Sequence, residues 1–132
     1  MFDLFRSRNK DEVVSRLPVE WPHHVVILTH ESFAKFIGMY PLSVVDFWAP
    51  WCGPCKTMFP RFRRLSRLYE GTVAFGRVNV KGEEKIAKQY NILGIPFFGF
   101  FRYGKKIGEV TGVKSVGDMK KFIDTYIARF ER

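Results

Sequence analysis

Residues 44–56 read Val44-Val45-Asp46-Phe47-Trp48-Ala49-Pro50-Trp51-Cys52-Gly53-Pro54-Cys55-Lys56. The part up to Trp48 is apolar apart from one carboxylate, which is typical of a strand buried on both faces in the centre of a sheet. The remaining part holds two cysteines separated by two residues, with a proline suited to the first position of a helix. The stretch therefore predicts a buried strand that leads through a cysteine pair into a helix.

The cysteine pair has the spacing that thiol-disulfide exchange requires. This reaction uses one thiolate to attack a substrate disulfide and a nearby second thiol to break the mixed disulfide that forms. Cys52 would lie just before the helix, whose positive end stabilises a thiolate, whereas Cys55, one turn further, would be shielded and more basic. Gly53 permits a tight loop, and Pro54 starts the helix without losing an internal hydrogen bond. We therefore expect Cys52 to attack and Cys55 to resolve.

Zinc binding is the alternative for such a pair, because Cys-x-x-Cys also forms half of many zinc sites. A closed tetrahedral site needs two further ligands. The chain has no other cysteine, and His23, His24 and His30 lack the His-x-x-x-His spacing of zinc ligands. We therefore expect no metal, with the histidines on the surface or in structural roles.

Composition favours a single-domain protein. The chain has 132 residues, of which 46% are hydrophobic and 17% aromatic, with 14 Phe, so we expect one domain with an aromatic-rich core. The net charge of +9 favours acidic partners, but nucleic-acid binding requires Lys and Arg gathered on one face, and we expect no nucleic-acid partner. No apolar run is long enough for a membrane span, and charges interrupt the N-terminus too often for a signal peptide. We therefore expect a soluble monomer in the reducing cytoplasm.

Hydrophobic periodicity predicts strands and helices in alternation on both sides of the cysteine pair. Strands are expected at residues 25–28, 42–48, 73–80, 97–102 and 107–111, and helices at 33–40, 54–69, 83–89 and 116–130. A turn at 103–106 contains Gly104 and joins the last two strands as an antiparallel hairpin. The last helix has Ser115 as its N-cap and one apolar face, formed by Val116, Met119, Phe122, Ile123, Tyr126, Ile127 and Phe130. The pattern predicts an α/β fold, a three-layer α/β/α sandwich around a central mixed β-sheet.

Residues 1–22 differ in their pattern of charged and apolar residues from the rest of the chain. They mix charges with apolar residues, end at the turn-like Trp21-Pro22, and favour a short helix near residues 11–16. Two interpretations are open: a segment packed on the outside of the domain, or an amphipathic arm that binds a partner or a surface. We therefore expect an N-terminal extension at 1–22 and a domain at 23–132.

Residues 44–56 resemble the active-site segment of the thioredoxin family. The similarity continues at prolines and glycines further along the chain, namely Pro60, Gly94-Ile95-Pro96, Gly104 and Gly112, and covers roughly residues 25–130. The resemblance implies a thioredoxin fold, a redox-active disulfide between Cys52 and Cys55, and an enzyme that reduces disulfides in protein substrates. It also implies a thioredoxin reductase as electron donor and no bound cofactor.

The resemblance assigns roles to further residues. Asp46, whose pKa burial among apolar neighbours would raise, would accept a proton from Cys55 through water. A purely structural role, with the carboxylate satisfied by hydrogen bonds, is the alternative. Pro96 would be cis and face the cysteines, and the backbone of the residue before it would pair with an extended substrate segment. The docking surface would have an apolar rim formed by Trp51, Gly94 and Ile95.

Three features depart from the pattern of the family. Phe97 follows the proline where many thioredoxins carry a small Thr, Arg77 stands where a buried lysine often accompanies the acid, and the cysteine-bearing helix carries four arginines. These departures bear on the choice of partner rather than on the chemistry. Two other functions stay open: a binding or assembly module that uses the thioredoxin surface, and a more oxidising protein of the disulfide isomerase type. Gly53-Pro54 between the cysteines resembles the reducing thioredoxins and favours the reductase.

Overall fold

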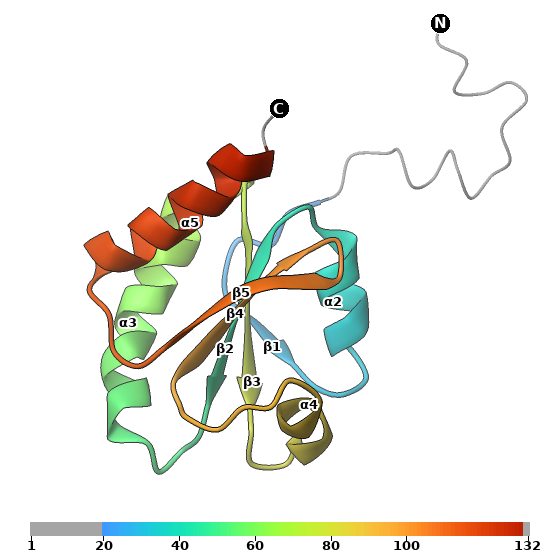
Figure 1. Cartoon of the computed structure of the whole chain (residues 1–132), viewed down its shortest axis with the longest axis vertical. Coiled ribbons are helices and arrows are strands. Elements are labelled where there is room, and N and C mark those ends of the chain that lie inside the picture. The colour runs from blue at the N-terminus through green and yellow to red at the C-terminus, as the bar shows by residue number, and fades with distance from the viewer. Residues whose placement is uncertain (1–19, 131–132) are drawn as a thin grey trace, which may run out of the picture.

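The computed structural model describes residues 20–130, and within them the predicted alternation of strands and helices is confirmed. In chain order the elements are β1 (Val26–Leu28), α2 (Phe33–Met39), β2 (Ser43–Trp48), α3 (Gly53–Leu68), β3 (Ala74–Asn79), α4 (Glu84–Gln89), β4 (Phe97–Arg102), β5 (Lys105–Thr111) and α5 (Val116–Phe130) (Figure 1). The helix expected near residues 11–16 lies outside the described residues.

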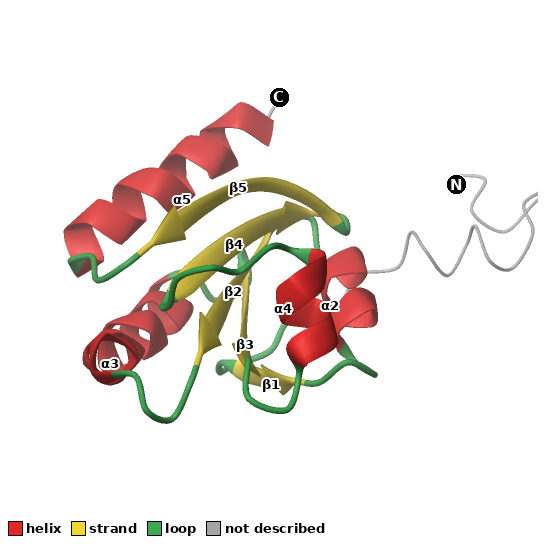
Figure 2. Ribbon diagram, turned by 60° about the horizontal axis from the view of Figure 1, so that its bottom comes forward, coloured by secondary structure: helices red, strands yellow, loops and turns green. Residues whose placement is uncertain are grey.

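The sheet has the strand order β1-β3-β2-β4-β5 and is mixed, as predicted. β1, β3 and β2 run parallel to one another, whereas β4 is antiparallel to β2 and β5 is antiparallel to β4. Helices α3 and α5 cover one face of the sheet and α2 and α4 cover the other (Figure 2). This arrangement is the expected three-layer α/β/α sandwich.

Strand β2 lies in the middle of the sheet, and its side chains alternate between the two faces. Val44 packs with the α3 and α5 side chains, whereas Val45 and Phe47 pack with those of α2 and α4. Since side chains two residues apart point to the same face of a strand, Asp46 shares the face of Val44. The buried carboxylate therefore lies on the side of the sheet that is covered by α3, the helix that carries the cysteines.

The core is rich in aromatic side chains, as the composition predicts. On the α2 side of the sheet, the ring centres of Phe33 and Phe101 lie 5.7 Å apart in an edge-on arrangement. On the α3 side, the ring of Phe62 lies 5.1 Å from that of Phe75. Such edge-on pairs add stabilisation beyond the apolar area that they bury.

The hairpin between β4 and β5 is tighter than predicted. Tyr103 and Gly104 both have positive φ, 45° and 88°, and form the turn alone, so Lys105 already pairs with Arg102. A two-residue turn with two positive φ values matches the twist of an antiparallel pair. Strand β5 therefore begins two residues earlier than expected.

The buried face of α5 is narrower than the sequence pattern indicates. Met119 and Ile123 are fully buried, but Phe122 is 37% exposed, so its expected place on the packed face is wrong. Phe122 lies about 100° around the helix from Ile123, at the edge of the stripe that meets the sheet. The start of the helix is as predicted, because the Ser115 hydroxyl accepts a hydrogen bond from the Asp118 N–H at 3.0 Å.

Candidate active site

Cys52 and Cys55 are joined by a disulfide at the start of α3. Cys52 is the N-cap residue of this 16-residue helix, and Cys55 lies in its first turn. The Cys55 backbone N–H donates a hydrogen bond to the Cys52 sulfur at 3.1 Å. A sulfur at this place receives both an amide hydrogen bond and the positive end of the helix dipole, which stabilise a thiolate once the disulfide is reduced.

The two sulfurs have different surroundings. Cys55 is fully buried and Cys52 is 7% exposed, beside a Trp51 side chain that is 68% exposed. Gly53 and Pro54, between the cysteines, are exposed as well. Cys52 is therefore the more accessible of the two cysteines.

The loop before β4 brings Ile95 to the cysteines. Ile95 packs in one apolar cluster with Cys52 and Cys55, and the peptide bond between Ile95 and Pro96 is cis, as the resemblance implies. Pro96 is buried and its carbonyl accepts a hydrogen bond from the Gly112 N–H at 2.8 Å, which anchors the loop to the residue that follows β5. Of the residues expected to form the docking surface, Ile95 thus packs beside the cysteines.

A hollow of about 460 Å³ opens beside this loop, and the sequence did not indicate it. Val80 and Ile95, which pack near the disulfide, line one part of it, and residues of α4 line another. Leu93 lines it too and is 87% exposed. An apolar pair before Gly94 that belongs to no strand, Ile92-Leu93, is the sequence feature that could have revealed this surface.

Asp46 is fully buried, as predicted. Its Oδ2 accepts a hydrogen bond from the Arg77 Nε at 3.3 Å, and its Oδ1 has no hydrogen-bond partner among the described residues. Burial raises the pKa of Asp46 from 3.8 to about 7, although the Arg77 guanidinium opposes the rise. A carboxyl group with such a pKa can take up and release a proton near neutral pH.

Arg77 is held beside Asp46 on the neighbouring strand β3. Its guanidinium carbon lies 4.1 Å from the ring centre of Trp48 and 3.6 Å from that of Phe59, and the residue is only 8% exposed. The guanidinium therefore packs against one ring from β2 and one from α3. A planar cation stacks well on aromatic faces and remains charged when buried.

Replacing Arg77 by methionine is expected to raise the pKa of Asp46 further above its ordinary value. The variant removes the cation that opposes the rise, and loss of an opposite charge at this range shifts a carboxyl pKa by about 1 unit or more. A ¹³C NMR titration of the Asp46 carboxyl group measures the change. Arg77→Lys keeps a positive charge and serves as the control, with a smaller expected shift. An unchanged pKa in the methionine variant would show that Arg77 does not act on Asp46.

Within residues 20–130, no three His, Cys, Asp or Glu side chains gather in a way that could hold a metal ion. His23 contacts Glu70, and His30 contacts Glu83 with its Nδ1 at 3.2 Å, both at the surface. No helix in the described part of the chain is both long and apolar enough to cross a membrane.

Comparison with known proteins agrees with this geometry. The family model of thioredoxin matches residues 24–125. A thioredoxin of Malassezia sympodialis is 40% identical over 88 residues, which is 66% of this chain and 84% of the relative. A chloroplastic M-type thioredoxin of spinach, Spinacia oleracea, is 38% identical over 98 residues, 74% of this chain and 54% of the relative, so the match spans about half the length of that protein.

A solved structure is similar over most of the chain. The crystal structure of the Malassezia sympodialis thioredoxin has a TM-score of 0.74 and 30% identity, and the match covers 85% of this chain and 98% of that one. The family model, the fold and the disulfide at the start of α3 agree with one another. The chain belongs to the thioredoxin family and is a thiol-disulfide oxidoreductase.

Proposed function

We propose that the chain reduces protein disulfides, with Cys52 as the attacking thiolate and Cys55 as the resolving thiol. One observation carries the proposal. Cys52 is the N-cap residue of α3 and is 7% exposed, whereas its disulfide partner Cys55 lies in the first turn and is fully buried. The two sulfurs are chemically alike, so their surroundings decide which of them reacts first.

The reaction proceeds in two exchanges. The Cys52 thiolate attacks one sulfur of the substrate disulfide, forms a mixed disulfide, and releases the other substrate sulfur as a thiolate. Cys55 then loses its proton and attacks the Cys52 sulfur, which releases the second substrate thiolate and forms the Cys52–Cys55 disulfide. Two electrons pass to the substrate, and a reductase returns the pair to the dithiol. No bound cofactor takes part.

Asp46 is proposed to accept the Cys55 proton in the second exchange, through water. Its pKa of about 7 and its place on the face of the sheet covered by α3 support this role. Asp46 Oδ1, which does not bond to Arg77, has no hydrogen-bond partner among residues 20–130, so it is available to a proton. Asp46 thus acts as a general base for the resolving thiol.

The substrate is proposed to dock as an extended segment along Ile95, whose backbone pairs with it beside the reacting sulfur. Gly94, Pro96 and the exposed Trp51 border the same surface. The hollow that Leu93 and Ile95 line would accept an apolar substrate side chain next to the disulfide. Gly53 and Pro54 shape the loop that presents the attacking sulfur.

We further propose that residues 1–22 are an extension of a domain at 23–132, and that the protein acts as a monomer in the cytoplasm with a thioredoxin reductase. Both cysteines of the chain belong to the site, which suits a reducing compartment. Because the spinach relative is chloroplastic, cell fractionation is the experiment that tests the compartment.

Trapping of the mixed disulfide tests the proposal. Cys55→Ser can attack but cannot resolve, so with insulin it is expected to accumulate a covalent adduct at Cys52, seen by mass spectrometry without reductant. Cys52→Ser retains only the buried thiol and serves as the matched control, with no adduct expected. Equal adduct formation in both variants, or an adduct at Cys55 alone, would overturn the assignment.

A further inference from the structure

Every charged side chain of helix α3 is basic. Between Gly53 and Leu68 it carries Lys56, Arg61, Arg63, Arg64 and Arg67 and no carboxylate. Basic residues stabilise the last turn of a helix by opposing its dipole, which accounts for Arg67 but not for the others. The excess of cations therefore needs an explanation outside the stability of the helix.

Four of these cations form one exposed stripe along the outer side of the helix, here called the basic stripe: Lys56, Arg63, Arg64 and Arg67. Their separations of seven, eight and eleven residues place them on one side of an α-helix. Met58, Phe62 and Leu65 on the opposite side are fully buried. Arg61 is not part of the stripe, because its guanidinium donates to the Lys114 carbonyl at 2.9 Å.

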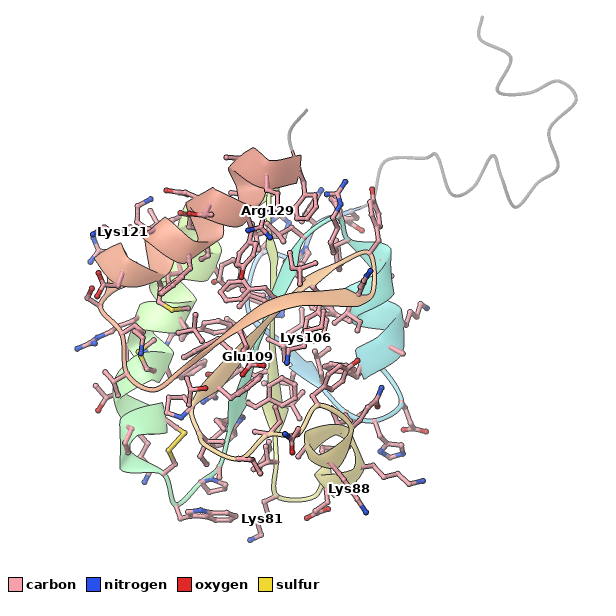
Figure 3. All side chains as sticks on the ribbon, viewed as in Figure 1. Lys81, Lys88, Lys106, Glu109, Lys121 and Arg129 are labelled. Atoms are coloured by element: carbon pink, nitrogen blue, oxygen red, sulfur yellow. A yellow bond between two sulfur atoms is a disulfide. The ribbon has the colours of Figure 1, made fainter. Side chains whose placement is uncertain are left out.

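No carboxylate in residues 20–130 pairs with the basic stripe. The ion pairs in this part of the chain join other residues: His23 with Glu70, His30 with Glu83, Arg77 with Asp46, and Lys106 with Glu109, the last of which is labelled in Figure 3. Like charges four residues apart on a helix, as at Arg63 and Arg67, repel each other. An anion on this surface would relieve that repulsion.

A hollow beside the stripe gives the surface a concave part. It has a volume of about 190 Å³ and is lined by Arg63, Arg67, His23 and His24, with the ring of Phe59 among the apolar atoms. The nearby Glu70 contacts His23 and does not line the hollow. A carboxylate side chain entering this hollow would meet two guanidinium groups, which bind carboxylates strongly.

The basic stripe begins at the reactive cysteines. With a rise of about 1.5 Å per residue, Arg63 and Arg67 lie roughly 16 Å and 22 Å along α3 from Cys52. A standard interface, roughly 30 Å across, therefore reaches both arginines when Cys52 lies near its edge rather than at its centre. Figure 2 shows that the helix lies at the outer edge of the molecule, so a partner can cover both its start and its flank.

We propose that the basic stripe binds an acidic segment of the protein whose disulfide Cys52 attacks. The inference rests on the proposed function and adds the class of substrate: protein disulfides flanked by Asp and Glu on the side that faces α3. An acidic polypeptide is favoured over a nucleic acid because the stripe is continuous with a site for protein disulfides. Long-range attraction of this kind mainly speeds the encounter of the two partners.

Two disulfide-linked peptides test the inference, alike except that one carries a run of aspartates and the other asparagines. With dithiothreitol as reductant, kcat/KM for the acidic peptide is expected to exceed that for the neutral one by about tenfold at an ionic strength of about 0.01 M. The ratio is expected to approach 1 at about 1 M salt, because the Debye length falls from about 30 Å to about 3 Å. A ratio near 1 at low salt would overturn the inference.

Charge-reversal variants test whether the preference for the acidic peptide depends on the basic stripe. Arg63→Glu combined with Arg67→Glu is expected to reduce the ratio of the two kcat/KM values to 1 or below. Lys105→Glu combined with Arg129→Glu changes the net charge equally at two exposed positions, one at the start of β5 and one near the end of α5, where Figure 3 labels Arg129. This double variant is expected to keep most of the ratio. Equal losses in the two double variants would overturn the inference in favour of net charge alone.

Two further outcomes separate the remaining possibilities. An oligonucleotide that inhibits at a lower concentration than a free aspartate peptide of equal charge would overturn the inference and assign the stripe to nucleic acids. Failure of the wild-type chain to reduce even the neutral peptide would instead overturn the proposed function, and this inference with it. The ratio is independent of the amount of folded protein, so partial unfolding of a variant does not mimic either result.

Discussion

Cys52→Ser is expected to lower the rate of insulin disulfide reduction by at least about a thousandfold, to the level of the uncatalysed reaction. A serine hydroxyl does not ionise near neutral pH and cannot form the mixed disulfide on which both exchanges depend. The buried Cys55 cannot replace it, because its sulfur has no access to a substrate. The turbidity assay of insulin with dithiothreitol measures the loss.

Thr57→Ala is the control for this variant. It removes a hydroxyl on the exposed side of the same helix, one turn beyond Gly53, and is expected to keep the rate within about threefold. Thermal unfolding of both variants establishes that each is folded. Full turnover by Cys52→Ser would contradict the account, because it would place the chemistry outside the cysteine pair.

Asp46→Asn is expected to change how the stability of the protein depends on pH. The folded state raises the pKa of Asp46 from 3.8 to about 7, so between these values the folded protein binds a proton that the unfolded chain has lost. The wild type therefore loses stability as pH rises through this window, by about 4 kcal/mol in all at 1.36 kcal/mol per pKa unit. The asparagine variant has no such group. The unfolding free energy of the wild type minus that of the variant is thus largest below about pH 4 and falls to its lowest value by about pH 8.

Urea unfolding of both proteins across this pH range measures the effect. The quantity of interest is the difference between the two unfolding free energies, in which the titration of all other groups cancels. Asp118→Asn makes the same chemical change at an exposed position in the first turn of α5, and is expected to alter stability by less than about 0.5 kcal/mol. A difference between the wild type and Asp46→Asn that stays constant with pH would show that the buried carboxyl does not titrate in this window.

The sequence predicted those features that depend on local pattern. The apolar run of β2 made the burial of Asp46 predictable, because a carboxylate in a central strand has no route to solvent. The places of Cys52 and Cys55 followed from helix geometry alone. The cis peptide bond before Pro96 could be predicted only from the family resemblance, since most peptide bonds before proline are trans.

Other features depend on contacts between distant segments, which no local pattern contains. Arg77 meets Trp48 and Phe59 only because β3, β2 and α3 come together, so its packing between two rings could not be predicted. The hollow beside Leu93 likewise forms where α4 meets the loop before β4. The four arginines of α3 were visible in the sequence, but the choice of which three are exposed depends on how the helix packs.

The reduction potential of the Cys52–Cys55 pair decides whether the chain gives electrons to protein disulfides. Equilibration of the wild-type protein with dithiothreitol buffers, followed by alkylation and mass spectrometry, measures it. We expect a value near −270 mV, the value of thioredoxins. A value at or above about −180 mV, the range of disulfide isomerases, would contradict the assignment as a reductase.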